Sequence, residues 1–151
     1  MQRASRDTGP VRILVADDDP SFRRTAGRVL SQAGYEVLEA ALGKDGLGVA
    51  REWQPDLIVL EDVFSLEKYP QSGIVLGKVC GVLLLAGTQS GIPLTEVPVR
   101  QAKQILTGNG KATKEQLERA VRSTLGAKAP IRPFHASDAL GLALIGLFRH
   151  R

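Results

Sequence analysis

The stretch Ile58-Val59-Leu60-Glu61-Asp62-Val63-Phe64 decides how the chain is organised. Its β-branched and leucine residues predict a buried parallel strand, and the apolar run ends at the carboxylate of Glu61. Open α/β sheets bind ligands beyond the carboxyl ends of their strands, so Glu61 is predicted to lie where chemistry takes place. The other segments matter chiefly through the side chains that they bring to this end of the strand.

The bulk composition predicts one soluble domain over residues 1–151. A chain of 151 residues with 43% hydrophobic content is long enough for one ordinary core and short for two. Residues 1–10 are polar and predict a flexible tail with no signal peptide. The apolar run 74–86 contains Lys78 and is shorter than the roughly 20 residues of a bilayer span, so no membrane contact is expected.

The single cysteine, Cys80, excludes a disulfide framework within the chain and favours a reducing cytoplasm. It lies inside an apolar run, so we expect it to be a small core residue. Charge is unevenly spread, because residues 1–62 carry a net charge of −3 and residues 63–151 a net charge of +7. An acidic half suited to a metal therefore precedes a basic half suited to phosphates, although the basic side chains could equally do no more than solvate helices.

Residues 11–60 show a βαβαβ pattern. Strands are predicted over residues 12–16, 35–38 and 57–60, with helices over residues 20–33 and 43–53 between them. Asp19 as N-cap and Pro20 at the first helical position begin the first helix, and Gly34 ends it. Right-handed crossovers would place the first strand in the middle of a parallel sheet.

Residues 61–151 predict mainly helices. The run 74–86 is interpreted as a core helix on which Gly73, Gly77 and Gly81 recur at spacing four, and an exposed part of it could form a dimer surface. An edge strand over residues 92–97, a short helix over 99–106 and a last helix over 136–148 are also expected. A capping box of Thr113 and Gln116 begins another helix, which Gly126 ends.

The first half resembles the receiver domain of bacterial response regulators. The resemblance covers residues 11–60 and rests on Ile13-Leu14-Val15-Ala16-Asp17-Asp18-Asp19-Pro20, on Gly34-Tyr35-Glu36-Val37, and on Pro55-Asp56-Leu57-Ile58-Val59-Leu60. It implies that Asp17 and Asp18 form a Mg²⁺-binding acidic pair and that a phosphate-accepting aspartate would fall at position 61. Here that position is Glu61, a departure at the residue that defines the activity.

The second half resembles the RuvC-type Holliday-junction resolvases, which have a ribonuclease-H-like fold. Five collinear segments carry the resemblance: Glu61-Asp62-Val63-Phe64, residues 76–86, Val99-Arg100-Gln101-Ala102-Lys103-Gln104, residues 107–116, and His135-Ala136-Ser137-Asp138-Ala139-Leu140-Gly141-Leu142-Ala143. The two resemblances together imply an α/β three-layer sandwich with a central, mainly parallel sheet, a hybrid of flavodoxin-like receiver and ribonuclease-H-like folds. Position 61 would join a receiver-like half (11–60) to a resolvase-like half (61–151), as in a natural or engineered chimera.

The resolvase resemblance implies a site for Mg²⁺ or Mn²⁺ made by Glu61, His135 and Asp138. The family's first-strand aspartate has no clean counterpart, and Asp17 or Asp18 could supply it if the two strand ends emerge side by side. Oxygen ligands with one imidazole suit these cations, and two such ions can cleave a phosphodiester.

The resemblance also implies a DNA-binding surface. Lys103 and Lys114 match lysines near the scissile phosphate, and Lys114 is included among the catalytic residues. Lys111, Arg119 and Arg122 extend the basic surface, although each could be a solvated side chain. Phe64 corresponds to an aromatic at the junction centre, where a ring can stack on an unpaired base, and the alternative for it is a packing role.

Three functions remain open. The first is a homodimeric endodeoxyribonuclease that resolves Holliday junctions in DNA recombination and repair, with branched DNA and, by resemblance, branch-migration helicases as partners. The second is a receiver-type phosphotransfer module, in which Glu61 would mimic a phosphorylated state. The third is an inactive hybrid that binds branched DNA.

Overall fold

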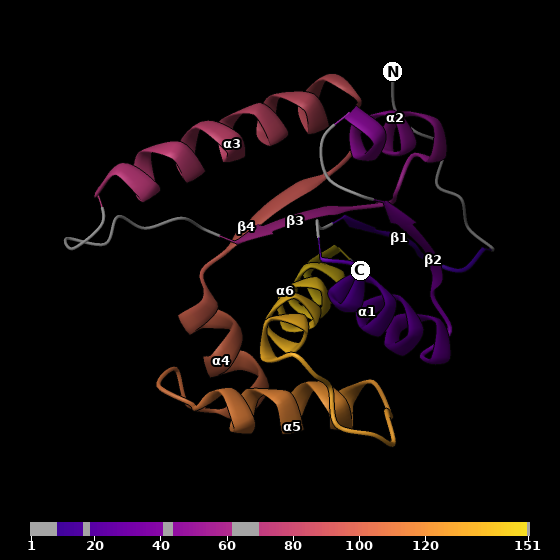
Figure 1. Cartoon of the computed structure of the whole chain (residues 1–151). Coiled ribbons are helices and arrows are strands. Elements are labelled where there is room, and N and C mark those ends of the chain that lie inside the picture. Colours follow the sequence, from indigo (N-terminus) through magenta and orange to yellow (C-terminus); the bar gives the residue numbers. More distant parts are fainter. Residues whose placement is uncertain (1–8, 17–18, 41–43, 62–69, 151) are drawn as a thin grey trace.

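The computed structural model describes residues 9–16, 19–40, 44–61 and 70–150 (Figure 1). The elements follow in the order β1 (Arg12–Ala16), α1 (Pro20–Gln32), β2 (Glu36–Ala40), α2 (Lys44–Trp53), β3 (Ile58–Glu61), α3 (Pro70–Gln89), β4 (Leu94–Val97), α4 (Val99–Thr107), α5 (Lys114–Thr124) and α6 (Phe134–His150). The predicted βαβαβ order of the first half is therefore confirmed. Several predicted bounds are shifted by a few residues: β2 and β3 each start one residue later than expected, β4 starts two residues later, α6 starts two residues earlier and α3 starts four residues earlier.

Helix α1 forms as its sequence predicts. The Asp19 side chain accepts a hydrogen bond from the backbone N–H of Ser21 at 2.8 Å, which satisfies one of the free donors of the first turn. Gly34 follows the helix with φ of 91°, a left-handed conformation that glycine adopts without a steric cost. The buried stripe of α1 contains Phe22, Ala26, Val29 and Leu30.

The strands form two parallel pairs within the described residues. Strand β1 pairs with β2 from Arg12↔Glu36 to Ala16↔Ala40, and β3 pairs with β4 from Ile58↔Leu94 to Glu61↔Val97. The prediction of one continuous sheet with the first strand in the middle is therefore wrong for these ladders.

Strands β1 and β3 are linked only where they begin. Arg12 donates its backbone N–H to Asp56 Oδ2 at 2.9 Å, and the Asp56 N–H returns a bond to the Arg12 carbonyl at 3.2 Å. Farther along, Val15, Val59 and Leu140 are among the apolar side chains that line a gap of about 190 Å³ between α1, α6 and the two strands. A gap lined by apolar side chains therefore separates β1 from β3 where a continuous ladder would have formed.

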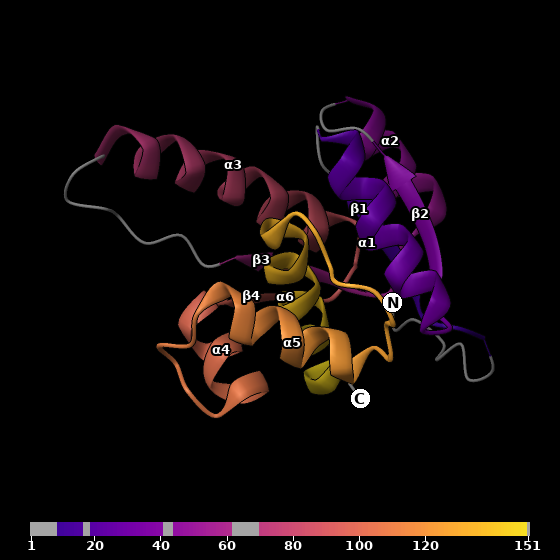
Figure 2. The same ribbon diagram turned by 60° about the horizontal axis from the view of Figure 1, so that its bottom comes forward.

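The elements are arranged in layers around the strands. Helices α2 and α3 lie on one side, and α1 and α6 lie on the other, with α4 and α5 beyond α6 (Figures 1 and 2). This layered α/β arrangement agrees with the predicted class. Helix α6 contacts α1, α4, α5, β3 and β4, so it joins the two halves of the chain.

Two apolar clusters meet on α6. The larger cluster joins α1, α5 and α6, and its members from α6 include Leu140 and Leu144. The smaller cluster contains Val97 and Ala102, together with Leu142 and Ile145 on another side of α6. A helix that is buried on several sides in this way needs apolar residues around most of its circumference.

Helix α3 is largely exposed, so the prediction that it is a core helix is wrong. Ile74, Val82 and Leu85 are 59%, 65% and 58% exposed, and a Cβ atom placed on Gly81 would meet no neighbouring atom within 4 Å. Gly87, near the end of α3, approaches the side chains of β3 and β4 closely, so the helix is held at that end.

The same helix carries Cys80, for which the sequence predicts a place in the core. Cys80 is partly exposed, so its expected place in the core is also wrong. Across the part of the chain that the structure describes, none of the helices combines the length and apolar character needed to cross a bilayer.

Gly146 allows α6 to lie directly on β3, and Gly146→Ala tests that contact. A Cβ atom at this position would overlap Val59 Cγ2 and lie 2.9 Å from Leu57 Cδ2. Overpacking of this kind costs about 1–3 kcal/mol, more than the roughly 1 kcal/mol that alanine gains over glycine in a helix. We expect a lower midpoint of thermal unfolding, measured by calorimetry.

Gly48→Ala is the matched control, because the same change on α2 meets no atom within 4 Å. It should leave the midpoint unchanged or raise it. An unfolding midpoint for Gly146→Ala equal to that of the wild type would contradict the proposed close approach of α6 and β3.

Candidate active site

Two carboxylates from distant parts of the chain lie close enough for the charge of one to affect the other. Glu61 ends β3, and Asp138 lies in the first turns of α6. Burial raises the pKa of both side chains above their ordinary values, and the negative charge of Asp138 raises the pKa of Glu61 further. The structure thus places Asp138 close enough to Glu61 to affect its ionisation, and their shared role as metal ligands stays a prediction.

Positive side chains from two other helices act on Asp138. Lys114 and Lys103 oppose the effect of burial and lower the pKa of Asp138, and His135 does so more weakly. Lys114 is the first residue of α5, and the Thr113–Gln116 capping box fixes where that helix begins. Two residues predicted to act near a scissile phosphate, Lys103 and Lys114, are thus close enough to Asp138 to affect its ionisation.

The Asp138 carboxylate is incompletely satisfied. Its Oδ1 atom is buried and has no hydrogen-bond partner among the described residues. A buried acceptor without a partner costs free energy, whereas a hard cation would use that oxygen as a ligand. Two carboxylates that repel one another, one with an unused oxygen, fit a divalent cation by the chemistry of their donors. Within the described ranges, however, no three acidic, histidine or cysteine side chains form a cluster able to hold a metal.

His135 is held by α1. Its ring stacks on Phe22 with centroids 5.3 Å apart and an angle of 16° between the planes, and its Nε2 lies 3.7 Å from Asp19 Oδ2. A hydrogen bond from the Ser21 backbone is the main cause that lowers the pKa of Asp19, and His135 contributes to it. His135 is therefore close enough to lower the pKa of Asp138, while the imidazole itself contacts Asp19 and Phe22. Its grouping with Glu61 and Asp138 as metal ligands stays a prediction.

The sequence predicts Asp19 as a helix cap and does not reveal it as a residue of this site. A cap is recognised from its neighbours in sequence, whereas the approach of Asp19 to His135 depends on how α1 packs on α6. Asp17, Asp18 and Phe64, which were predicted to bind metal or DNA, lie outside the described residues. Whether Asp17 or Asp18 completes the metal site stays a prediction.

The remaining predicted DNA-binding residues lie on and beside α5. Lys111 and Arg119 are exposed, as a phosphate-binding role requires. Arg122 instead forms an ion pair with the buried Glu118, Nε to Oε1 at 3.0 Å. Glu118 also accepts a hydrogen bond from the Ile131 N–H at 2.9 Å, so this pair ties the segment before α6 to α5. Arg122 therefore has a structural contact that sequence reasoning missed.

A family model described as crossover junction endodeoxyribonuclease RuvC matches residues 45–146. The chain belongs to this family. The family name denotes hydrolases that cut DNA at crossover junctions, so the RuvC-type resemblance is confirmed. The match begins 16 residues before position 61, so the predicted start of the resolvase-like half was too late.

Relatives with the same name align with this chain over different shares of their own length. The RuvC protein of Prosthecochloris aestuarii is 38% identical over 104 residues, which are 68% of this chain and 55% of that protein. The Synechococcus sp. (strain WH7803) protein is 34% identical over 116 residues, 77% of this chain and 73% of its own. The Pelobacter propionicus protein is 31% identical over 150 residues and covers 87% of this chain. The chain thus spans little more than half the length of the first of these relatives.

Solved structures agree with the family. Thermus thermophilus RuvC in complex with Holliday junction substrate has a TM-score of 0.56 and 29% identity, and it covers 88% of this chain and 72% of its own. A second Thermus thermophilus RuvC structure has a TM-score of 0.50 and 28% identity over 86% of this chain. These alignments reach well beyond residues 61–151. The receiver resemblance of residues 11–60 stays a prediction.

Asp138→Asn tests the cation-binding interpretation through stability. A carboxylate with a raised pKa in the folded state contributes stability below its unfolded pKa, and that contribution is lost as the pH rises through its folded pKa. Without metal at neutral pH, Asp138→Asn should therefore unfold a few degrees higher than the wild type, and the difference should vanish in acid. Mg²⁺ or Mn²⁺ should raise the unfolding temperature of the wild type and not of the variant, measured by thermal shift.

Asp56→Asn serves as the control, since Asp56 lies at the opposite end of β3. Its response to the cation should match that of the wild type. An equal thermal shift by Mg²⁺ in wild type and Asp138→Asn would contradict a cation held by Asp138.

Proposed function

We propose that this chain is a metal-dependent, structure-selective endodeoxyribonuclease that resolves Holliday junctions, with Glu61 and Asp138 as its central pair of metal-holding carboxylates. The observation that carries the proposal is the raised pKa of Glu61 beside the negative charge of Asp138, whose own buried Oδ1 has no hydrogen-bond partner among the described residues and whose carboxylate lies close to Lys114 and Lys103. Family membership and the likeness to a RuvC bound to a Holliday junction support branched DNA as the substrate.

The proposed roles differ between the acidic and the basic residues. Glu61 and Asp138 would hold Mg²⁺ or Mn²⁺, with His135 and either Asp17 or Asp18 as further candidate ligands. A bound cation supplies Lewis-acid stabilisation to the phosphodiester and lowers the pKa of an attacking water. Lys103 and Lys114 orient the scissile phosphate and neutralise its charge, which lets the DNA approach two carboxylates. Phe64, just past β3 in sequence, is proposed to stack on a base at the junction centre.

Asp19 and Phe22 orient the imidazole of His135 in this proposal. Stacking on Phe22 fixes the ring plane, and the Asp19 carboxylate attracts the Nε2 edge. The receiver-like segment therefore contributes to the site through α1.

A cleavage assay on a synthetic four-way DNA junction tests the proposed activity. Wild-type protein with Mg²⁺ or Mn²⁺ should give symmetric nicks, and Glu61→Gln and Asp138→Asn should each lower the rate by at least about 100-fold while retaining junction binding. Nicks are measured on denaturing gels with each strand labelled in turn.

Lys128→Gln is a matched control, because it removes one exposed charge from the segment between α5 and α6 and should leave cleavage unchanged. Binding without nicks in either metal would favour the alternative of an inactive hybrid that binds branched DNA. Phosphate incorporation from acetyl phosphate, with no nicking, would favour the phosphotransfer alternative.

A second copy of the chain is the proposed partner of α3. Two symmetric cuts in a four-way junction need two active sites related by a two-fold axis. Exposed apolar side chains of α3 include Ile74, Val75, Val82 and Leu85, and the open positions at Gly77 and Gly81 let another backbone approach closely. Apolar surface of this kind on an exposed helix favours burial against a partner. The cytoplasm and branch-migration helicases are further expectations from the family resemblance.

Val82→Asp tests this interface. A charge in the middle of a buried apolar contact should dissociate the dimer, so sedimentation should give the monomer mass at concentrations where the wild type is dimeric. Gln71→Asp, an equal charge change at an exposed polar position in the first turn of α3, should remain dimeric. A monomeric wild type, or a dimeric Val82→Asp, would contradict α3 as the interface.

A further inference from the structure

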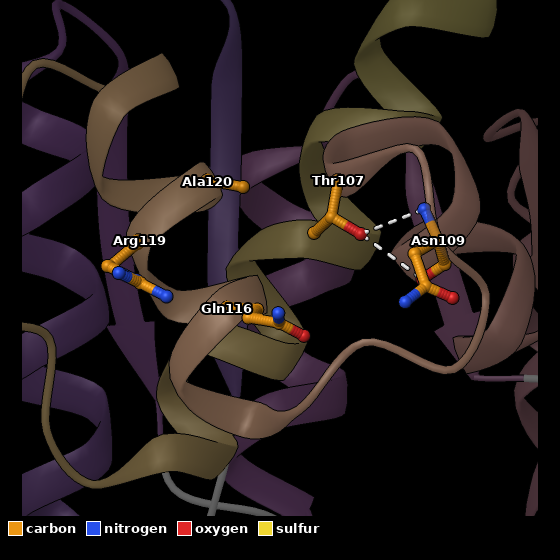
Figure 3. Close-up of a pocket in the computed structure, with 5 residues that line it drawn as sticks. All are labelled: Thr107, Asn109, Gln116, Arg119 and Ala120. Carbon is orange, nitrogen blue, oxygen red and sulfur yellow. Dashed lines mark hydrogen bonds between the residues drawn. The ribbon is translucent and has the colours of Figure 1, made fainter.

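The flank of the α4–α5 pair carries a hollow of about 290 Å³ that is separate from the Glu61–Asp138 pair. It is lined by Thr107, Asn109, Gln116, Arg119 and Ala120 (Figure 3). Thr107 ends α4 and Asn109 follows it in the loop, while the other three residues lie on the exposed side of α5. Leu117 and Val121 on the opposite side of α5 are buried towards α6, so the hollow opens away from the core.

The hollow presents hydrogen-bond donors. Asn109 Oδ1 accepts the Lys111 N–H at 2.9 Å, and Gln116 Oε1 accepts the Thr113 N–H at 2.9 Å. Both amide oxygens are thereby engaged inside the protein, which leaves the two NH₂ groups as the parts available to a ligand. Arg119 adds a guanidinium, and it forms no ion pair within the described part of the chain. No carboxylate lines the hollow.

The loop that shapes the hollow is already ordered by its own hydrogen bonds. Gln104 donates to the Gly108 carbonyl at 2.8 Å and accepts the Gly110 N–H at 2.9 Å, so its amide bridges the turn. The Thr107 hydroxyl accepts the Asn109 N–H at 3.2 Å and donates to the Lys103 carbonyl at 2.8 Å. Gly108 provides the turn with φ of 75°. A ligand would therefore meet donors that are fixed before it binds.

We infer that this hollow is an anchor for one backbone phosphodiester of a DNA arm, held by Arg119, Gln116 and Asn109. A guanidinium beside two amide NH₂ groups, with no acid present, matches the oxygens of a phosphodiester. The anchor rests on the proposed function and deepens it, because it lies outside the cleavage site. Lys103 and Lys114 act at the scissile phosphate, and the anchor fixes the arm along the flank of α4 and α5.

Gln116→Glu is the sharpest variant. A glutamate at this position keeps the acceptor for the Thr113 N–H and so preserves the capping box, which uses Glu or Gln equally. It also replaces the NH₂ donor by a negative oxygen inside the hollow. We expect an unfolding temperature at or above that of the wild type, because an acid in the first turn of a helix is favourable, and junction affinity lower by on the order of tenfold.

Arg119→Gln gives an independent measurement through salt. Loss of one phosphate contact should reduce the slope of log K against log salt concentration by about 0.9, whereas loss of a distant charge should not. Binding is measured in Ca²⁺ with the Glu61→Gln protein as the parent, so that cleavage does not interfere. Gln89→Glu and Arg51→Gln are the matched controls, since they make the same chemical changes at exposed positions at the ends of α3 and α2.

The outcomes separate the anchor from the activity. Parent binding that is weakened by Gln116→Glu and Arg119→Gln, with both controls unaffected, supports the anchor. Equal affinity and salt slope in all variants overturns the anchor and leaves the nuclease proposal standing. No junction binding by the parent overturns both.

The side-chain amide NMR signals of Asn109 and Gln116 identify the source of the phosphate. Shifts caused by the junction and not by millimolar inorganic phosphate support a DNA phosphodiester. Shifts caused by inorganic phosphate, with no change in the junction affinity of the variants, would assign the hollow to free phosphate and overturn the anchor.

Discussion

The close approach of α6 to β3 is the contact on which the rest of the structure depends. Gly146 faces Leu57 and Val59 near the start of β3, while Asp138 affects the ionisation of Glu61 at its end. Eight residues of helix span about 12 Å, and four residues of strand span about 13 Å, so α6 runs antiparallel along β3 with the two acids at the same end. A glycine at one end of this contact thus aligns carboxylates at the other.

The site that results is unfavourable by itself. Two acids share a partly buried space, and an oxygen of Asp138 has no partner among the described residues. The fold offsets this cost with positive charge from two helices, since Lys103 on α4 and Lys114 at the start of α5 both favour ionised Asp138. The buried Glu118–Arg122 pair then fixes the segment leading into α6. A divalent cation would neutralise the remaining negative charge of the two acids.

Local sequence signals predicted the elements well where the physics is local. The Asp19 cap, the Thr113–Gln116 capping box and the left-handed glycine at Gly126 each act within one or two helical turns, and each is present. Predictions failed where burial depends on distant partners. The apolar run of α3 predicts a core helix, but most of its apolar residues are exposed. Periodicity alone does not show which element covers a helix. The prediction of a continuous sheet is wrong because an apolar-lined gap separates β1 from β3.

The sequence by itself determined the family, the order of the elements and the chemical identity of Glu61, His135, Asp138, Lys103 and Lys114, because these are carried by residue types at fixed spacing. The tertiary structure decided which of them interact. It brought Glu61 and Asp138 together and turned the imidazole of His135 towards Asp19 and Phe22. It also shaped the hollow between Asn109 and Arg119. Those outcomes depend on packing between segments that are distant in the sequence, in some cases by more than 100 residues. No local pattern encodes such contacts.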